Sequence, residues 1–390
     1  MIRTAGRRAW HVGPSAVLLG LAACGLAREA PPNGAYARAI GQAQADLDAG
    51  RIAEARRRLD ATDKSLRGFE YDYLLARAKA AAKPGTAPDL VRTIAVPDIE
   101  TRYGVLSPVD RHLVFICRDG SMRVHDLTAP AVPPKVLTAT GGNAIWSGAF
   151  SRDGTTFVAG HQNGDVVVWD AKTWKVRHRV PLGADWPVRE LAIAPDGAAF
   201  VGEGKDELQL WSLAGDKPQK VAGVGERYTF GEGLAYSPKG DVLATGGMFD
   251  IILYDAKTGK QTTSMRHASY TMGLEFSPDG KRIASAPRGN VNKFLAVFDV
   301  AAGKPLFNAG PFPDYIAGLA FTPDGKRVAA TGCEKLLRLF DATTGGVVLT
   351  LPRPECTAKP AVTADGRVLG WSEPDGYKVI DLGKKAAGGR

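Results

Sequence analysis

The chain has 390 residues, of which 44% are apolar and 23% are charged, as in an ordinary soluble globular protein. This composition excludes a wholly disordered chain, a collagen and a protein with many membrane spans. The 46 glycines favour many tight turns over long helices, and the formal net charge of +9 is a mild imbalance for a chain of this length.

The first residues have the organisation of an export signal. Three arginines precede an apolar stretch at 16–23, which is too short to span a bilayer. The stretch ends in Leu-Ala-Ala before Cys24, which resembles the lipobox of bacterial lipoproteins. The resemblance implies that residues 1–23 are removed and that Cys24 is lipidated. The protein would then be exported and attached to a membrane, facing the periplasm or the cell exterior. A plain signal peptide that happens to contain a cysteine is the alternative.

A short spacer at 24–34 leads into a segment at 35–83 that is rich in Ala, Leu, Arg and Glu, all good helix formers. Gly50 separates the first two predicted helices, and Ser65 is predicted to cap a third. The run at 46–60 resembles a tetratricopeptide helix pair. These helices are too few to form a free-standing solenoid, because each repeat needs neighbours that bury its apolar face. We therefore expect a small cap packed on the main domain. A peptide-binding role for these helices is the alternative. Apolar residues recur at helical spacing, among them Ile40, Ala43 and Leu47.

Seven similar units follow at 91–382. Each has a tight turn, a β-branched run, a second turn and a pair that is usually an aromatic residue followed by Asp. The first turns read SPVD (107–110), SRDG (151–154), APDG (194–197), SPKG (237–240), SPDG (277–280), TPDG (322–325) and TADG (363–366). The pairs are His125-Asp126, Trp169-Asp170, Trp211-Ser212, Tyr254-Asp255, Phe298-Asp299, Phe340-Asp341 and Ile380-Asp381. Their second members are 40 to 44 residues apart, a period that indicates four-stranded propeller blades.

These units resemble the blades of the WD-repeat, G-beta-like family. VVVWDAKTWK at 166–175 is similar to a third strand with its turn, and HASYTMGLEFSPDG at 267–280 to an entry loop, first strand and turn. The resemblance implies an all-β fold: a seven-bladed β-propeller of four-stranded antiparallel blades, preceded by the small α-helical segment. The third-strand aromatic would pack between blades, and the Asp after it would accept backbone hydrogen bonds in the next turn.

The ends of the repeat region predict how the ring closes. The last unit supplies three strands, and a spare strand at 91–96 precedes the first unit. In the family such a strand completes the last blade, which would remove two exposed sheet edges. We therefore expect a truncation before Val91 to leave the ring intact and one after Val96 to open it. Residues 383–390 are expected to form a disordered basic tail.

No pattern typical of catalysis, metal binding or nucleotide binding is found in the sequence. His-Glu-x-x-His, Gly-x-Ser-x-Gly and phosphate-binding loops are missing, and the six histidines are scattered singly. We expect no catalytic residue, no cofactor and no metal, and interpret His125 as a core imidazole. The alternative is a hydrolase or lyase acting on sugars or lactones at the channel mouth. Its carboxylates would come from Asp185, Glu190, Glu226, Glu232 and Glu275.

The family resemblance also bears on the cysteines. If Cys24 is acylated, Cys117, Cys333 and Cys356 remain. In a WD blade Cys333 would lie in the turn between the second and third strands, and Cys356 in the loop entering the next blade. These two loop types share one face in the family, which implies a possible disulfide between Cys333 and Cys356. Two separate thiols are the alternative.

Aromatic residues recur just before the first strand of most units, which in the family lies near the mouth of the channel most often used to bind proteins or peptides. The candidates are Tyr103, Trp146, Trp186, Tyr228, Phe230, Tyr270 and Tyr315. They could instead turn inward and plug the channel. We expect a non-catalytic, membrane-anchored scaffold that binds a protein or peptide through this face. Nucleic acid is not an expected partner, because the basic residues are dispersed among acids without a stripe.

Overall fold

The structure is a computed structural model. The residues that it describes are 33–82, 90–95, 100–138, 143–183, 186–226, 230–267, 270–288, 294–312, 315–352, 359–373 and 376–382. Several predicted features lie outside the described residues: the export signal with Cys24, Asp185, Tyr228, Cys356 and the basic tail. The side chains of Glu226, Phe230, Glu232 and Tyr270 are likewise not described.

The N-terminal segment forms three α-helices and one short 3-10 turn. They are α1 (Asn33–Asp48), α2 (Ile52–Asp60), the 3-10 helix η1 (Lys64–Leu66) and α3 (Phe69–Ala81). The prediction that Ser65 caps the third helix is wrong. Asp63 caps η1 instead by accepting a hydrogen bond from the Ser65 N–H at 2.8 Å, and α3 begins after Gly68 with no side-chain cap. The physical reason is that a 3-10 turn intervenes and takes Ser65 into its interior.

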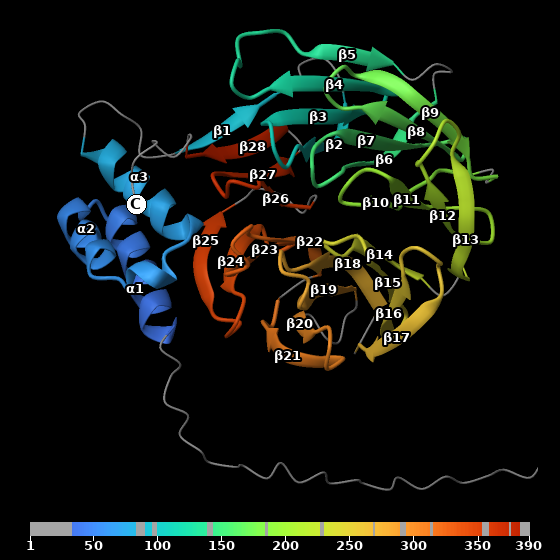
Figure 1. Ribbon diagram of the computed structural model, residues 1–390. Helices are drawn as coiled ribbons and strands as arrows, with labels where there is room; N and C mark the ends of the chain where they lie inside the picture. Colours follow the sequence, from blue (N-terminus) through green and yellow to red (C-terminus); the bar gives the residue numbers. More distant parts are fainter. Residues whose placement is uncertain are drawn as a thin grey trace, which may run out of the picture.

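The rest of the described chain forms seven four-stranded antiparallel sheets arranged as a ring (Figure 1). Blade 1 is β2 (Thr101–Leu106), β3 (His112–Cys117), β4 (Ser121–Asp126) and β5 (Lys135–Thr138). Blade 2 is β6 (Ile145–Phe150), β7 (Thr156–His161), β8 (Asp165–Asp170) and β9 (Lys175–Pro181). Blade 3 is β10 (Leu191–Ile193), β11 (Ala199–Glu203), β12 (Glu207–Ser212) and β13 (Gln219–Glu226).

Four further blades complete the ring. Blade 4 is β14 (Phe230–Tyr236), β15 (Val242–Gly247), β16 (Asp250–Asp255) and β17 (Gln261–Arg266). Blade 5 is β18 (Tyr270–Phe276), β19 (Arg282–Arg288), β20 (Leu295–Asp299) and β21 (Lys304–Ala309). Blade 6 is β22 (Ile316–Phe321), β23 (Arg327–Gly332), β24 (Leu336–Asp341) and β25 (Val347–Pro352). Blade 7 is β26 (Ala361–Val362), β27 (Val368–Glu373), β28 (Gly376–Asp381) and β1 (Val91–Ile94).

The predicted closure of the ring is confirmed. β1 pairs antiparallel with β28, with Val91 opposite Ile380, and so supplies the outermost strand of blade 7. Side chains reinforce the seam between blades 7 and 1. Arg111 forms ion pairs with Asp365 at 3.1 Å and Asp381 at 3.5 Å. Both chain ends of the propeller are therefore held in one blade, which leaves no unpaired edge at the join.

The repeated hydroxyl-x-Asp-Gly turn forms a small hydrogen-bond network. In blade 5 the Ser277 hydroxyl donates to Asp279 at 2.6 Å and accepts from the Arg282 N–H at 2.9 Å. The hydrogen bond from Ser277 holds the pKa of Asp279 below its usual value. Gly280 has a φ of 72°, which favours glycine. The same hydroxyl-to-backbone bond recurs at Ser151, Ser237, Thr322 and Thr363.

The third-strand aromatics have the predicted packing role. Phe298 of blade 5 belongs to an apolar cluster with Leu253 of blade 4, and Trp169 of blade 2 to one with Met122 of blade 1. The Asp that follows such a residue also acts as predicted: Asp255 accepts hydrogen bonds from the backbone N–H and the hydroxyl of Thr258. Each blade thus buries its face on its neighbour, because a single four-stranded sheet cannot bury both faces alone.

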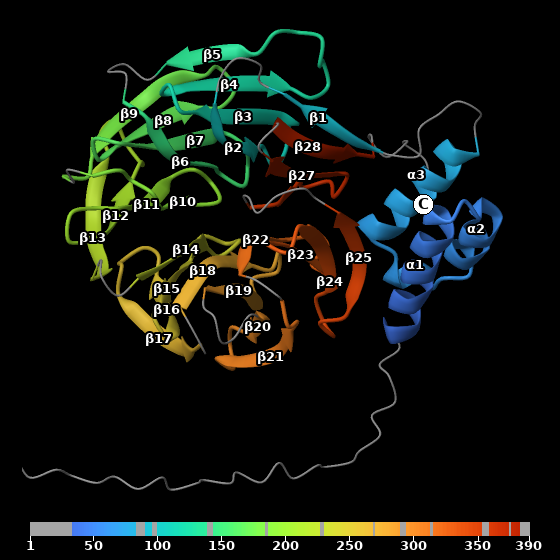
Figure 2. The ribbon, with the colours of Figure 1, turned by 180° about the vertical axis from the view of Figure 1, so that it is seen from behind.

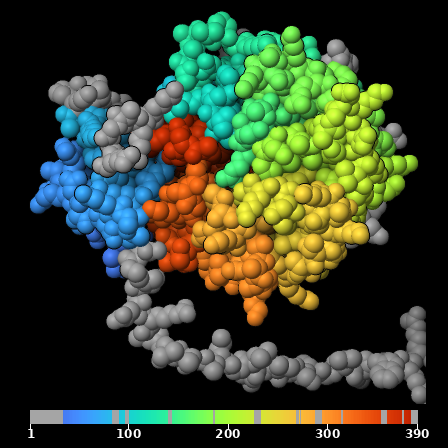
Figure 3. Space-filling model, in the orientation of Figure 1, coloured from blue at the N-terminus to red at the C-terminus, as the bar shows by residue number. Residues whose placement is uncertain are grey.

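The helical segment lies outside the ring, beside blades 6 and 7 (Figures 1 and 2). In the space-filling view the blue helices pack against the orange and red part of the ring (Figure 3). One apolar cluster runs from Leu74 of α3 and Ile40 of α1 to Leu349 of β25 and Trp371 of β27. The helices are therefore part of the propeller's core rather than a separate unit. No helix in the described ranges is long and apolar enough to span a membrane.

Candidate binding sites along the central channel

The innermost strands of the seven blades line a central channel with two connected cavities. One cavity has a volume of about 350 Å³ and the other about 240 Å³, and both are lined by Tyr103 and Lys359. The larger one extends to the turns that follow the innermost strands, at Pro108, Arg152 and Pro195. We call this end the turn face. We call the opposite end, where the innermost strands begin, the entry face.

Trp146 is the centre of a cation–aromatic cluster on the entry face. The guanidinium of Arg102 lies 3.9 Å from the centroid of its ring and that of Arg189 lies 5.4 Å away. The indole N–H donates to Gln162 at 2.9 Å. The hydroxyl of Tyr103 donates to the Trp146 carbonyl at 3.4 Å. These contacts hold a half-buried ring in one orientation at the channel mouth.

Arg102 carries a positive charge that is poorly compensated. Its Nε is buried without a hydrogen-bond partner in the described part of the chain. Burial, and secondarily the charge of Arg118, lower the pKa of Arg102. Arg118 itself pairs with Glu100 at 3.1 Å. An anionic group placed beside Arg102 would therefore gain a charge-assisted hydrogen bond.

The other predicted aromatic residues are spread around the same end of the blades. Trp186 is half-buried in the segment before β10, and Tyr315 precedes β22 with 38% of its surface exposed. Phe230 and Tyr270 are the first residues of β14 and β18. The structure brings Tyr103 and Trp146 into contact.

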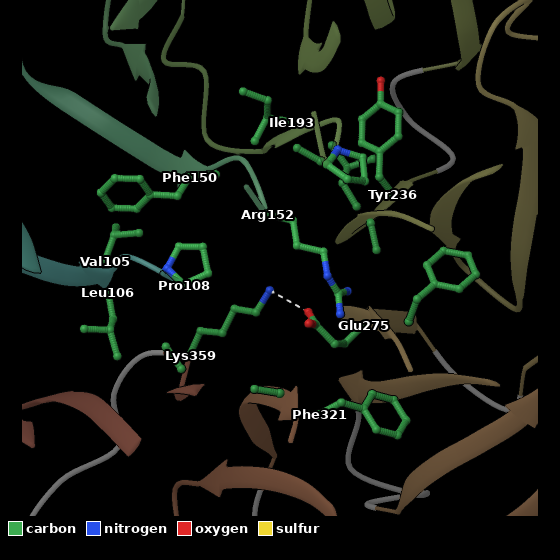
Figure 4. A pocket seen from close by; sticks show the side chains of 18 of the residues that line it. Val105, Leu106, Pro108, Phe150, Arg152, Ile193, Tyr236, Glu275, Phe321 and Lys359 are labelled. Carbon is green, nitrogen blue, oxygen red and sulfur yellow. Dashed lines mark ion pairs between the residues drawn. The ribbon is translucent and has the colours of Figure 1, made fainter. Parts of the chain in front are cut away.

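An ion pair lies within the channel. Lys359 Nζ is 3.1 Å from Glu275 Oε2, so a residue that precedes β26 pairs with one on β18 (Figure 4). The charge of Glu275 and, more weakly, that of Glu190 raise the pKa of Lys359. The chain reaches this position because a Cβ on Gly318 would collide with the Lys359 backbone, and glycine leaves the space free.

Comparisons with known proteins agree with this geometry. The family model described as "WD domain, G-beta repeat" matches residues 132–170, which end with β8. The chain is therefore similar to the WD40, G-beta-like propellers. Only one repeat is matched, so the other six blades of this WD40-type propeller are recognised by their structure and by the period of their turns.

The relatives are guanine nucleotide-binding protein beta subunits. A subunit from Lymnaea stagnalis is 28% identical over 139 residues, which is 35% of this chain and 40% of the relative. The beta-1 subunit of Caenorhabditis briggsae is 26% identical over 145 residues, or 36% of this chain and 42% of the relative. That of Drosophila melanogaster is 27% identical over 146 residues, with the same coverage. The chain spans about two fifths of the length of these curated relatives.

The WD40-type propeller places the cysteines as follows. Cys333 lies in the turn between β23 and β24, as predicted, and it is disulfide-bonded. Cys117 is a buried free thiol. Cys356 lies outside the described residues, so its pairing with Cys333 stays a prediction.

Of the carboxylates considered for an enzyme, the structure describes the side chains of Glu190 and Glu275, and both line the channel. Glu275 borders the larger cavity and Glu190 the smaller one. Glu275 forms an ion pair with Lys359. Among the described residues no group of three or more His, Cys, Asp or Glu side chains could hold a metal ion.

Four of the channel's charged residues were not identified from the sequence: Arg102, Arg152, Arg189 and Lys359. A signal was present for Arg152, because five of the seven turns have proline at this position and only the turn of blade 2 has an arginine. Arg102 and Lys359 have no such signal, since each is important only through partners on other blades.

Proposed function

We propose that this WD40-type propeller is a non-catalytic scaffold that binds a protein or peptide partner through its entry face. The observation that carries the proposal is the cluster of Trp146, Arg102 and Arg189 at the channel mouth. Tryptophan and arginine are the residues most enriched at the energetic centres of protein interfaces. The relatives are named as subunits, which is consistent with a role in an assembly.

The partner segment is expected to be acidic. Arg102 and Arg118 lie close enough for the charge of one to lower the pKa of the other, and a partner carboxylate would offset this repulsion. The hydrogen bond from Trp146 to Gln162 keeps the indole ring in place before binding. Less side-chain entropy is then lost when the partner docks.

The test is to capture the partner with the exported protein, identify it, and measure how variants bind it. Trp146→Ala with Trp186→Ala should weaken binding by about 2 kcal/mol or more, roughly thirtyfold, while the thermal unfolding midpoint stays close to that of the wild type. Val176→Ala, on the outermost strand of blade 2, is the matched control and should bind normally. Unchanged binding by the double variant would contradict the proposal.

We also propose that the scaffold is held at a membrane by a lipid on Cys24, after export and removal of residues 1–23. Support comes from the basic start, the short apolar run and the Leu-Ala-Ala-Cys sequence. In a bacterial host the Cys24→Ser variant should leave the membrane fraction and lose labelling by a fatty-acid analogue. Equal labelling of the variant and the wild type would exclude this anchor.

An enzyme at the channel mouth is not favoured by any specific contact. Glu275, which lines the larger cavity, is paired with Lys359. A glycosidase would need a second carboxylate facing it across the substrate.

A further inference from the structure

The larger cavity, at the turn face, combines an apolar wall with a few charged groups. Its volume of about 350 Å³ falls in the range of about 300–1,000 Å³ typical of small-molecule sites. Residues from all seven blades line the cavity, and the apolar ones include Leu106, Phe150, Ile193, Phe276 and Phe321. Such a wall suits the body of an apolar ligand and gives it no hydrogen bonds.

Two cations and one carboxylate meet in this cavity. Lys359 and Glu275 form the ion pair already described, and the Arg152 side chain points toward that pair from the turn of blade 2 (Figure 4). Arg152 forms no ion pair or hydrogen bond through its side chain within the part of the chain that the structure describes. The cavity therefore holds one more positive charge than negative, next to an apolar wall.

We propose that the turn-face half of the channel binds a small organic carboxylate with an apolar body, whose carboxylate is bound by Arg152 and Lys359. The planar fork of an arginine matches a carboxylate with two parallel hydrogen bonds. Because Arg152 and Lys359 together carry one more charge than Glu275 offsets, an anionic ligand would be attracted to them, whereas a cationic ligand would be repelled.

The position of Arg152 supports a specific role for this side chain. The equivalent turn residues of neighbouring units, Pro108, Pro195 and Pro238, line the same cavity as short apolar rings. Arginine lacks the fixed φ with which proline favours this turn, but it places a charged group at the cavity. This site is at the opposite end of the channel from Trp146, so it does not depend on the partner proposed above.

The experiment measures binding of 2-naphthoate to the full chain by calorimetry, with neutral 2-naphthamide as the matched ligand. We expect naphthoate to bind with a dissociation constant below about 1 mM and naphthamide to bind at least about tenfold more weakly, since only the acid can pair with Arg152. Decanoate and butyrate test longer and shorter apolar bodies.

Two variants give opposite expectations. Arg152→Ala should weaken naphthoate binding by about tenfold or more because the unpaired guanidinium is lost. Glu275→Gln should tighten it, since the resident carboxylate no longer competes for the two cations. Arg57→Ala, on the exposed surface of α2, controls for a general loss of positive charge and should bind like the wild type. Thermal unfolding of each variant confirms that it is folded.

Several results would overturn the proposal. The proposal is wrong if naphthoate, decanoate and butyrate all have dissociation constants above about 5 mM. It is also wrong if the Arg152→Ala variant binds naphthoate as tightly as the wild type does. Equal binding of naphthamide and naphthoate would show that the cavity recognises only apolar surface. Tighter binding of the peptide Gly-Gly-Gly-Leu-Phe with a free carboxyl end than of naphthoate would assign the site to a peptide terminus and end the small-ligand assignment.

Discussion

At the residue scale, His125 replaces an aromatic residue that most other blades have in their third strand. Its ring packs edge-on against Phe115 with centroids 5.3 Å apart, and its Nε2 is buried without a hydrogen-bond partner in the described chain. Burial, and secondarily the charge of Arg123, lower the pKa of His125. The fold therefore disfavours the charged form of this half-buried imidazole, which is consistent with a packing role for His125.

This lowered pKa predicts acid sensitivity. An unfolded histidine titrates near pH 6.5, so the unfolded state takes up a proton that folded His125 resists. The stability due to neutral His125 is complete above about pH 6.5 and falls as the pH drops below it. We expect His125→Phe to lose less stability between pH 7 and pH 5 than the wild type, measured as the urea midpoint at each pH.

His112 provides a control with the opposite sign. A hydrogen bond to Asp110 at 2.8 Å raises the pKa of His112 in spite of partial burial. Its contribution is complete below about pH 6.5 and is lost as the pH rises through the folded-state pKa. The His112→Gln variant should therefore lose more stability than the wild type on going from pH 7 to pH 5. Parallel pH profiles for the wild type and both variants would contradict these assignments.

At the scale of elements, a buried ion-pair network joins the helical segment to blade 6. Arg327, 2% exposed, donates to Oε1 of the fully buried Glu70 at 2.7 Å. The same oxygen accepts a hydrogen bond from the Tyr36 hydroxyl at 2.6 Å, and Arg327 also pairs with Asp341 at 3.2 Å. Burial, followed by the charge of Glu70, raises the pKa of Tyr36. Helices α1 and α3 are thus bound to β23 by charge as well as by apolar contact.

Removing one partner of this network should be costly. Glu70→Leu leaves Arg327 buried with only part of its charge compensated, so we expect the free energy of unfolding to fall by about 3–5 kcal/mol. The exposed pair Arg57–Glu54 is the matched control, and Arg57→Ala should cost less than about 1 kcal/mol. Urea unfolding measures both.

A third variant separates charge from packing. Glu70→Leu combined with Arg327→Met should recover part of the lost stability, because no unpaired buried cation remains. Should Glu70→Leu cost no more than Arg57→Ala, the helices would not be coupled to blade 6.

At the scale of the whole molecule, two different devices stabilise the ring. β1 supplies the missing strand of blade 7, and the helical segment covers the outer side of blades 6 and 7 with a shared apolar cluster. A truncation before Val91 is still expected to leave the ring closed, but it should lower the stability of the ring. Such a cut would expose that cluster and deprive Arg327 of Glu70.

Two truncated chains test this view. A chain starting at Leu90 should keep a closed ring and unfold cooperatively, but at a lower temperature than the full chain, because its covering helices are gone. A chain starting at Glu100 also lacks β1 and should lose cooperativity, since blades 1 and 7 are no longer joined by a complete sheet. Calorimetry distinguishes them. Identical unfolding of the two truncated chains would refute closure by β1.

The blade count was predictable because each blade is a local structure. The turn around Ser277, the packing of Phe298 and the capping by Asp255 depend on residues within one or two repeats, so their spacing carries the architecture. The start of α3 was missed for an equally local reason. Both Asp63 and Ser65 are residue types that favour N-caps, so composition does not show that Asp63 caps a 3-10 turn while α3 begins without a side-chain cap.

The channel's contacts could not be derived in the same way. Arg102 and Arg189 approach the Trp146 ring from blades 1 and 3, and Lys359 reaches Glu275 from a distant repeat. These distances depend on how seven sheets pack in a ring. Periodicity within the chain therefore specifies the seven blades and their turns. The packing of the blades around the channel brings the charged side chains together, since residues on different repeats have no local interaction that encodes their meeting.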